Sequence, residues 1–293
     1  MITWIRGRRR RQQQATSTSD ADTGDYIFGE GDAEISRLNF QHYMFRLAFQ
    51  GDYSAPLQSP RDILDVASGT GRLARELARR FPEANVIGFD ISPEQLNAAL
   101  AEGTDPMPDN CTFLPGNALE PFGFASGSFD FTIARACSSF IPVAQWPQVI
   151  RELMRVTRRG GWVEIRDFGL VRSRNLALNE LTAKFAHMGN ARGIHPGAGP
   201  FLKQYIDLVG GHHVLLRNVT VRSGLPGKTS RAGQLLLADY LALMDRVSPI
   251  VSQTGLDTRQ HWQALIRQAR DETRVDPDNN YAEVELTSAY FRL

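Results

Sequence analysis

The stretch Ile-Leu-Asp-Val-Ala-Ser-Gly-Thr-Gly-Arg-Leu-Ala, residues 63–74, decides how the rest of this chain is organised. Its first five residues are apolar except for Asp65 and predict a short buried strand. Gly69 and Gly71 then break the strand, and the apolar residues that follow recur at helical spacing. The chain therefore turns from strand to helix over bare backbone. A ligand can approach the helix N-terminus closely there, with the Asp65 carboxylate facing it.

Strands and helices alternate after this turn. Further strands are expected at residues 85–90, 111–114, 129–134 and 162–167. Ser92, Pro93 and Gln95 mark the start of a helix, with Ser92 as its capping residue. A helix at 147–156 ends in a basic last turn followed by two glycines. Strands separated by crossover helices predict an α/β fold with a parallel, doubly wound sheet.

The two ends of the chain differ from this alternating part. Residues 1–25 are basic and then polar, which favours a disordered tail over a nucleic-acid or lipid contact. Residues 26–58 contain one amphipathic stripe and predict an N-terminal helical cap. The later part predicts two closing strands, separated by a helical insertion at 231–275 that covers the substrate side. We expect the core to comprise 59–230 and 276–293.

The expected fifth strand carries charges in its interior. Val163 and Ile165 alternate with Glu164 and Arg166, whereas an interior parallel strand is normally apolar on both faces. Either one face is partly solvated or the charges are used. Partial solvation is the slightly favoured interpretation.

The bulk composition argues against several classes of protein. The chain of 293 residues has a net charge of +1, which gives no reason to expect a nucleic-acid partner. Its two cysteines make no disulfide framework and fit a reducing compartment, so we expect a cytoplasmic location. No apolar run approaches the roughly 20 residues that span a bilayer, and no apolar region follows the basic start as in a signal peptide. We therefore expect no membrane association.

Several later stretches carry a resemblance to a known family. They are residues 65–71, Gly-Phe-Asp-Ile-Ser at 88–92, Gly-Asn-Ala at 116–118 and Ser-Phe-Asp-Phe at 128–131. In this order they resemble the successive motifs of class I S-adenosylmethionine-dependent methyltransferases. Residues 151–161 are similar to the helix and turn before that family's fifth strand. The match covers about 61–167, and the segment 37–42 resembles a branch of type 11/25 methyltransferases with an N-terminal helical cap. The resemblance implies a seven-stranded Rossmann-like sheet.

The resemblance also implies S-adenosylmethionine as cofactor. The backbone at Gly69–Gly71 would pass under its amino acid part, with Asp65 near the ammonium group, and Asp90 would accept hydrogen bonds from the ribose hydroxyls. Asn117 stands where the family usually has aspartate, which removes a charge from the contact to adenine. The cofactor-binding residues implied are Tyr26, Asp65, Ala67, Ser68, Gly69, Gly71, Asp90, Ile91, Asn117, Ala118 and Arg135.

Each carboxylate or amide in this set has a purely structural alternative. Asp65 could stabilise the start of the helix, Asp90 a turn at a strand end, and Asn117 a turn. The stretch from Gly69 also fits the dinucleotide fingerprint, which keeps an NAD(P)-dependent oxidoreductase open. The Tyr-x-x-x-Lys pair of short-chain reductases is absent, because the positions four before the three lysines hold Glu180, Gly199 and Gly224. A cofactor-binding regulator without turnover is a further alternative.

Methyl transfer from a sulfonium is an in-line displacement, for which the protein supplies orientation, exclusion of water and, where needed, a base. A base is expected where the fourth and fifth strands end or in the segment that follows. The catalytic candidates are Asp167, His187 and His195, although a surface-loop histidine is the favoured interpretation of His195.

The acceptor expected behind these residues is a small, partly apolar molecule, methylated on O, N or C, as in the tailoring of natural products in secondary metabolism. No metal is expected, because the pair His212 and His213 lacks a third ligand nearby. Whether the chain forms a homodimer is left open by the sequence.

Overall fold

The computed structural model describes residues 32–101, 106–223 and 231–293. The predicted tail at 1–25 and the cofactor candidate Tyr26 lie outside these residues. Within them, no helix combines the length and the apolar character needed to cross a lipid bilayer.

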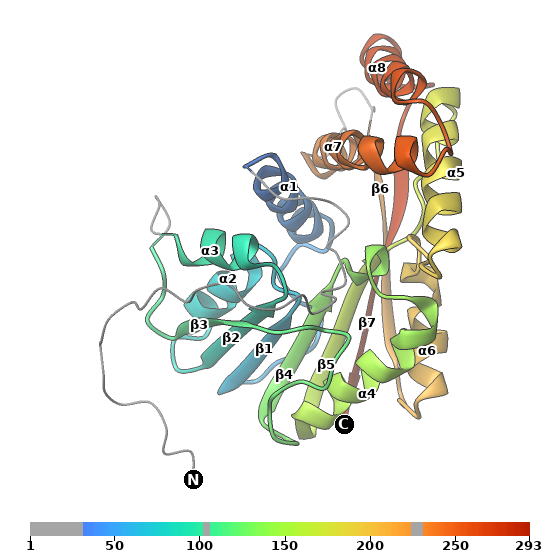
Figure 1. Ribbon diagram of the computed structural model, residues 1–293. Helices are drawn as coiled ribbons and strands as arrows, with labels where there is room; N and C mark the ends of the chain where they lie inside the picture. Colours follow the sequence, from blue (N-terminus) through green and yellow to red (C-terminus); the bar gives the residue numbers. More distant parts are fainter. Residues whose placement is uncertain (1–31, 102–105, 224–230) are drawn as a thin grey trace, which may run out of the picture.

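One seven-stranded sheet forms the centre of the molecule, with the strand order β3-β2-β1-β4-β5-β7-β6 (Figure 1). Its strands are β1 Asp62–Val66, β2 Asn85–Asp90, β3 Cys111–Pro115, β4 Phe129–Arg135, β5 Thr157–Phe168, β6 Leu215–Arg222 and β7 Glu283–Arg292. The first five strands run parallel, and β7 is antiparallel to both neighbours. The predicted doubly wound sheet, with a helical insertion before the last strand, is confirmed.

Helices cover both faces of the sheet. The helices α2 Arg72–Arg80 and α3 Pro93–Leu100 pack on one face, and α4 Trp146–Val156 and α6 Leu202–Leu208 on the other. Ile63 and Leu64 of β1 point to opposite faces and belong to different apolar clusters. This explains the unbroken apolar run in that strand, since both of its faces are buried. Ser92 caps α3 as predicted, accepting a hydrogen bond from the Gln95 N–H.

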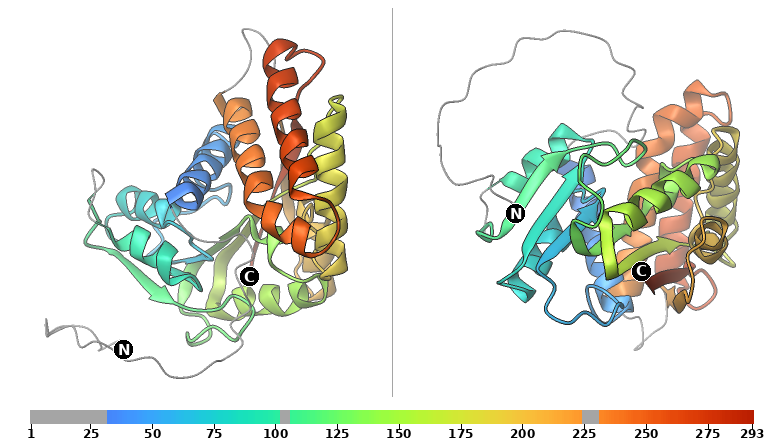
Figure 2. Two further views of the ribbon diagram at one scale, coloured as in Figure 1. Left: turned by 45° about the horizontal axis from the view of Figure 1, so that its top comes forward. Right: turned by 90° about the horizontal axis from the view of Figure 1, so that it is seen from below.

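A second group of helices lies beyond the carboxyl ends of the parallel strands (Figures 1 and 2). It consists of α1 Asp32–Ala48, α5 Leu176–Ala191, α7 Arg231–Gln253 and α8 Arg259–Val275. The helix α1 packs against α7, and α8 packs against both α5 and α7. Residues of these four helices share one apolar cluster, which includes Phe45, Leu181, Met244 and Trp262. The cap and the insertion therefore pack against one another.

The prediction that one face of β5 is partly solvated is wrong. Glu164, Arg166 and Asp167 are completely buried. Both carboxylate oxygens of Glu164 accept N–H bonds from Ser54, and Oε2 also accepts one from Ala55, at 2.8–2.9 Å. The charges of this strand are thus used to fix the segment that joins α1 to β1.

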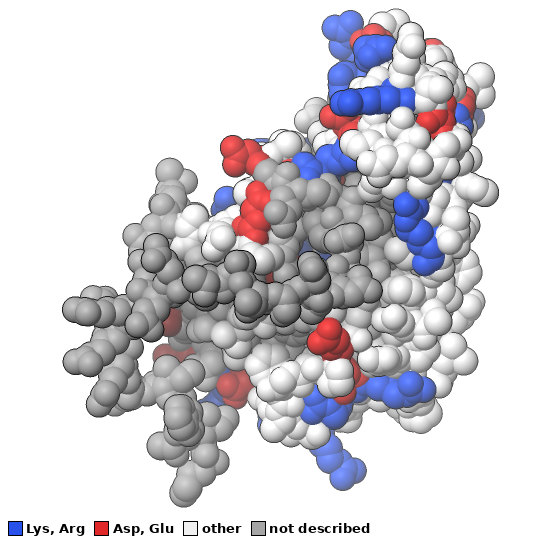
Figure 3. All heavy atoms as spheres, in the orientation of Figure 1, with Lys and Arg blue, Asp and Glu red and all other residues white. Residues whose placement is uncertain are grey.

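The face of the molecule seen in Figure 3 carries charges of both signs. Basic and acidic side chains lie close together at the α8 end and also at the lower end of that face. The expectation that nucleic acid is not a partner stays a prediction.

Candidate functional site

The turn between β1 and α2 is held in a tight left-handed conformation. Ala67, Gly69 and Gly71 have φ angles of 54°, 55° and 70°. A β-carbon on Gly71 would stand 2.3 Å from the Phe113 ring, so only glycine fits there. Ala67 has a β-carbon in a conformation that L-residues rarely adopt, which costs about 1–2 kcal/mol. The tight turn is therefore kept at the expense of local strain, and its residues Ala67 to Thr70 line the cavities beside it, whereas Gly71 lines neither.

Asp90, at the end of β2, supports this turn. Its Oδ2 accepts the Gly69 N–H at 2.8 Å and its Oδ1 accepts the Ser92 N–H at 3.0 Å. Burial raises its pKa, and these backbone hydrogen bonds oppose that change. Each carboxylate oxygen still has a second lone pair that a hydroxyl can use. The structural and functional interpretations of Asp90 are therefore compatible.

A cavity of about 350 Å³ opens at the carboxyl ends of the strands. The predicted cofactor residues among those lining it are Ala67, Gly69, Asp90, Ile91, Asn117, Ala118 and Arg135. A smaller cavity of about 50 Å³ is lined by Asp65 and Ser68 and shares Ala67, Gly69 and Arg135 with the larger one. Residues from the ends of four strands, β1 to β4, thus meet at one edge of the sheet.

Asn117 lines the cavity but its side chain is already engaged. Its Oδ1 accepts the Leu119 N–H at 2.9 Å and its Nδ2 donates to Glu120 at 3.1 Å. The side chain therefore acts as a turn former, the structural alternative. Its backbone, with that of Ala118, remains beside the cavity.

Asp65 and Arg135 bring opposite charges to the smaller cavity without neutralising each other. Oδ2 of Asp65 and Nη1 of Arg135 have no hydrogen-bond partner, and no ion pair within 4.0 Å joins these two described residues. Burial raises the Asp65 pKa to about 7, although the nearby Arg135 charge and the Ala74 N–H at the start of α2 lower it. Burial also lowers the Arg135 pKa. Both residues therefore have unused capacity to bind a zwitterion.

Beyond Arg135 the large cavity becomes apolar. Its wall is built from the loop after β4, the end of β5, and the helices α5 and α7; its apolar residues include Phe140, Phe168, Leu170, Val171, Phe185, Leu236, Leu243 and Val284. This chamber is walled on one side by the insertion that was expected to cover the substrate side.

One hydroxyl pair interrupts the apolar wall. The hydroxyl groups of Thr182 and Tyr240 lie 2.5 Å apart, and Thr182 also donates to the Leu178 carbonyl at 2.9 Å. Because Thr182 has one proton to give, Tyr240 donates to Thr182. The Tyr240 oxygen then keeps a lone pair for a donor group on a ligand.

A buried ion pair between α1 and α7 forms part of the cavity lining. Arg37 donates to Asp239 at 2.8 Å, and Glu34 binds the same guanidinium at 2.7 Å. Burial raises the Asp239 pKa to about 6, and the Arg37 charge opposes this. Arg37 and Asp239 both line the cavity. The cap is thus held over the site by charge as well as by packing.

Asp167, a predicted catalytic residue, lies behind the cavity wall. It accepts the Ser138 hydroxyl at 2.6 Å and the N–H groups of Ser138 and Phe168 at 2.8 Å. Burial raises its pKa to about 6. Ser138 does line the cavity, so any contact of Asp167 with a ligand is made through that hydroxyl.

Neither predicted histidine is among the described residues that line the cavity. His187 is exposed on α5. His195 packs on Phe201, with ring centroids 4.9 Å apart, while its neighbours Ile194 and Pro196 line the cavity. Sequence spacing placed the loop correctly but could not tell which of its side chains face inward. The catalytic role of both histidines stays a prediction that this geometry does not favour.

The sequence did not single out Gln41, Thr182, Asp239 and Tyr240, all of which line the cavity. Tyr240 and Asp239 follow one another on an ordinary amphipathic helix and carried no motif. A signal did exist on α1, where His42 interrupts an otherwise apolar stripe. His42 lines the smaller cavity.

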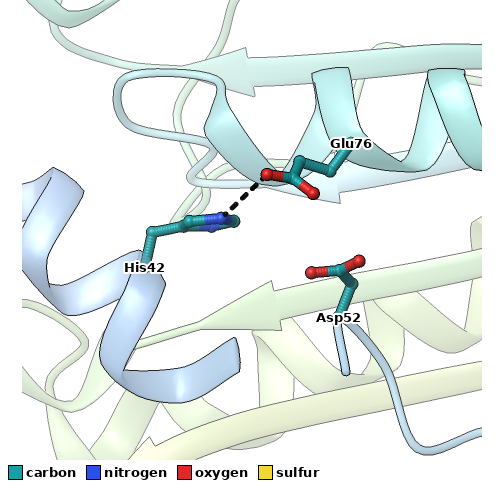
Figure 4. Close-up of side chains that lie close together, drawn as sticks. All are labelled: His42, Asp52 and Glu76. Atoms are coloured by element: carbon teal, nitrogen blue, oxygen red, sulfur yellow. Dashed lines mark ion pairs between the residues drawn. The ribbon is translucent and has the colours of Figure 1, made fainter. Parts of the chain in front are cut away.

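His42 also belongs to a cluster with Asp52 and Glu76 (Figure 4). The three side chains point toward one another, and His42 Nε2 lies 3.6 Å from Glu76 Oε1. One histidine and two carboxylates are a set that metals can use. Arg46, however, forms ion pairs with both carboxylates. We interpret the cluster as an ion-pair network, and the expectation of no metal stays a prediction.

Comparison with known proteins identifies the domain built around this site. Residues 63–161 match a family described as a methyltransferase domain. Methyltransferase str3 of Strobilurus tenacellus is 32% identical over 152 residues, which are 51% of this chain and 51% of that protein. The secondary metabolism regulator laeA of Monascus pilosus is 32% identical over 146 residues, 48% of this chain and 36% of that protein. The chain thus spans about half the length of the former and about a third of the latter.

Solved structures agree on the fold. Phosphoethanolamine N-methyltransferase 2 of Haemonchus contortus, in complex with S-adenosylmethionine, is 18% identical with a TM-score of 0.52, covering 88% of this chain and 52% of that one. The [4+2]-cyclase SpnF is 16% identical with a TM-score of 0.50, covering 84% and 79%. The chain therefore has the fold of S-adenosylmethionine-dependent methyltransferases, and residues 63–161 match the methyltransferase domain family.

The cofactor of this class is S-adenosylmethionine, and the residues present fit it. The unused charges of Asp65 and Arg135 match a zwitterionic amino acid end, and the tight turn between them offers bare backbone. Asp90 stands one strand away with acceptor capacity for a ribose.

Proposed function

We propose that this protein transfers the methyl group of S-adenosylmethionine to a small, partly apolar acceptor, on oxygen, nitrogen or carbon. The observation that carries the proposal is the continuity of the large cavity. Its lining runs from Gly69 and Asp90 to the apolar chamber beside Phe185 and Leu236. A cofactor and an acceptor can thus share one continuous cavity.

Each part of the enclosure has a task in this proposal. Asp90 and the backbone beside Asn117 and Ala118 hold the adenosine, while Asp65 and Arg135 hold the amino acid end. The cofactor supplies a methyl group on a sulfonium, which is reactive without help from the protein. The chain's own contribution is to align the acceptor and to exclude water, which the packing of α1 on α7 supports.

The chamber also indicates what kind of acceptor fits. Its wall is largely apolar, and its charged residues Arg37 and Asp239 neutralise each other. Tyr240 offers one hydrogen-bond acceptor. We infer an uncharged acceptor with an apolar body and, besides the atom that is methylated, one hydroxyl or amine group directed at Tyr240. The names of the relatives, a methyltransferase and regulators of secondary metabolism, support a role in natural-product tailoring.

A second candidate is regulation, because several of the relatives are named secondary metabolism regulators and one, from Emericella nidulans, is named a protein-methionine methyltransferase. In that case the acceptor is a protein, or no transfer takes place. The chamber's largely apolar wall favours the small molecule.

Calorimetry followed by a transfer assay separates these candidates. The protein is titrated with S-adenosylmethionine, S-adenosylhomocysteine and NAD, then incubated with methyl-labelled cofactor and either a panel of small phenols, amines and activated carbon acids or a protein extract. Binding of both sulfur compounds, with label in small molecules, is the expected result. Label only in protein, or binding with no transfer, would support regulation. NAD binding without a response to the sulfur compounds would refute the proposal.

A further inference from the structure

The cap helix α1 reaches the cofactor site through Arg135. The guanidinium stands at the end of β4 and lines both cavities. Its Nη2 lies 3.3 Å from His42 Nδ1, and its Cζ lies 5.9 Å from the centroid of the Phe45 ring. Both of these partners are on α1. A side chain rooted in the sheet is thus positioned by two residues of the cap.

This contact fixes the protonation state of His42. A guanidinium can only donate hydrogen bonds, so His42 Nδ1 must accept. The single proton of the neutral ring is then on Nε2, which faces Glu76 Oε1 at 3.6 Å (Figure 4). Burial lowers the His42 pKa below its usual 6.5, the Arg135 charge lowers it further, and Glu76 opposes both effects. His42 is therefore neutral at pH 7.

The same geometry argues against a metal at this cluster. A metal on Nε2 would move the ring proton to Nδ1, where it would face the donors of Arg135. Two carboxylates of the cluster are also already paired with Arg46. The arrangement is instead a chain of contacts from α2 through His42 to Arg135.

We propose that His42 is a positioning residue for cofactor binding: its neutral form, protonated on Nε2, holds Arg135 so that the remaining N–H groups of the guanidinium bind the carboxylate of the cofactor. The inference rests on the proposed cofactor site. Nη1 of Arg135 has no partner among the described residues, which leaves it for this anion. His42 makes no contact with the ligand in this scheme and acts through Arg135 alone.

Protonation of His42 removes the hydrogen bond that Arg135 donates to it. The charged groups facing the ring are Arg135 on β4, Glu76 on α2 and Asp52 in the segment after α1, with Arg46 paired to both acids. In acid, Nδ1 becomes a donor and places a second positive charge against Arg135. The guanidinium is then displaced, and affinity for the carboxylate falls.

Two substitutions separate the two sides of the ring. In His42→Asn the amide oxygen takes the place of Nδ1 and can accept from Arg135. In His42→Gln the amide extends to the place of Nε2, which keeps the contact to Glu76 and leaves Arg135 without its acceptor. Two ligands separate the two ends of the cofactor, because 5′-methylthioadenosine has the nucleoside of S-adenosylhomocysteine but no amino acid end.

The four combinations are measured by calorimetry at pH 7.5. We expect His42→Gln to lower the affinity for S-adenosylhomocysteine about tenfold, which is the scale of one misaligned hydrogen bond to a charged group. The affinity for 5′-methylthioadenosine should be unchanged. His42→Asn should stay within about threefold of wild type for both. The inference would be overturned if His42→Gln bound S-adenosylhomocysteine with unchanged affinity. It would also be overturned if this variant lost affinity equally for both ligands.

Nitrogen NMR of His42 tests the inference apart from the proposed function. The ¹⁵N shifts should report a neutral ring protonated on Nε2 at pH 7. A ring protonated on Nδ1, or a charged ring at that pH, would overturn the positioning role whether or not the cofactor binds. If wild type binds neither ligand while NMR gives the expected tautomer, it is the proposed function that fails.

The pH profile adds a readout that a purely structural role would not move. Between pH 7 and 5, the affinity of wild type for S-adenosylhomocysteine should fall more steeply than that of His42→Asn. Asp65 titrates in both proteins, so the difference between the two profiles reports His42. Parallel profiles would contradict the inference.

Discussion

Glu164 and Arg166 stand two residues apart on the same face of β5 and are joined by a hydrogen bond of 2.6 Å between Arg166 Nε and Glu164 Oε1, with neither side chain exposed. Around this pair, Arg166 also donates to the Gly51 carbonyl and lies over the Phe49 ring, 4.6 Å from its centroid. All of these contacts hold the segment that follows α1. The pair therefore sets where the cap meets the sheet, and with it the position of His42 beside Arg135.

Removing one partner of this pair should be costly. In Glu164→Gln the Arg166 charge loses its carboxylate while both groups stay buried, and we expect the free energy of unfolding to fall by about 3–5 kcal/mol. Urea unfolding at pH 7 measures the change. Arg172→Gln is the matched control, since Arg172 pairs with Glu283 at 3.7 Å but is 67% exposed, and it should change stability by less than about 1 kcal/mol. Similar losses in both variants would contradict this account.

The strand-to-helix turn at residues 63–74 and the parallel strands were predictable because strand periodicity, glycine breaks and helix caps are local signals. The charges of β5 were misjudged for the opposite reason. Their partners Gly51, Ser54 and Ser288 lie far away in the sequence, so nothing local shows that the charges are satisfied.

The acceptor side of the site shows the same limit. Tyr240 and Thr182 are 58 residues apart in the sequence and lie on different helices, and only the fold brings their hydroxyls to 2.5 Å. The cofactor side of the site could be predicted from the sequence because its residues lie within a few positions of strand ends. The topology of the sheet alone brings these strand ends together. The inward or outward direction of a loop side chain such as His195 has no such rule.

The tight turn gives a prediction about a single β-carbon. Gly71→Ala should lower the free energy of unfolding by about 3 kcal/mol or more, because its β-carbon would overlap the Phe113 ring and lie 2.9 Å from Ala99. Gly193→Ala is a matched control, since Gly193 has the same φ of 70° but nothing within 4 Å of the added carbon. It should cost only about 1–2 kcal/mol of left-handed strain. Equal losses would show that backbone strain, and not the Phe113 contact, restricts the turn.

Asp65 should lower the stability of the fold while it contributes to ligand binding. Its folded pKa of about 7 lies above the usual 3.8, so the folded state binds more protons than the unfolded chain between these values. The destabilisation of the folded state by its buried charge is greatest above pH 7, decreases as the pH falls, and is absent below about pH 3.8. We expect Asp65→Asn to raise the free energy of unfolding at pH 8 by about 1–3 kcal/mol.

Urea unfolding of wild type and Asp65→Asn at pH 8 and pH 5 measures this change, and the gain should be smaller at pH 5. The same variant should bind S-adenosylhomocysteine at least tenfold more weakly at pH 8, because the ligand's ammonium loses its carboxylate. A variant that is less stable at pH 8 but binds normally would show that Asp65 serves the start of α2 instead.

Tyr240 should affect the acceptor and not the cofactor. Tyr240→Phe removes the oxygen whose lone pair faces the chamber but keeps the ring, and Thr182→Val removes the group that orients it. For an acceptor found in the panel that carries a second hydroxyl or amine, both variants should raise KM about five- to tenfold and leave the S-adenosylhomocysteine Kd unchanged. An analogue without that donor group should be methylated equally well by wild type and variants. Tyr205→Phe is the control, because Tyr205 stacks on Trp146 outside the cavity lining. If KM rises for both acceptors alike, the hydroxyl shapes the chamber wall and does not recognise a polar group.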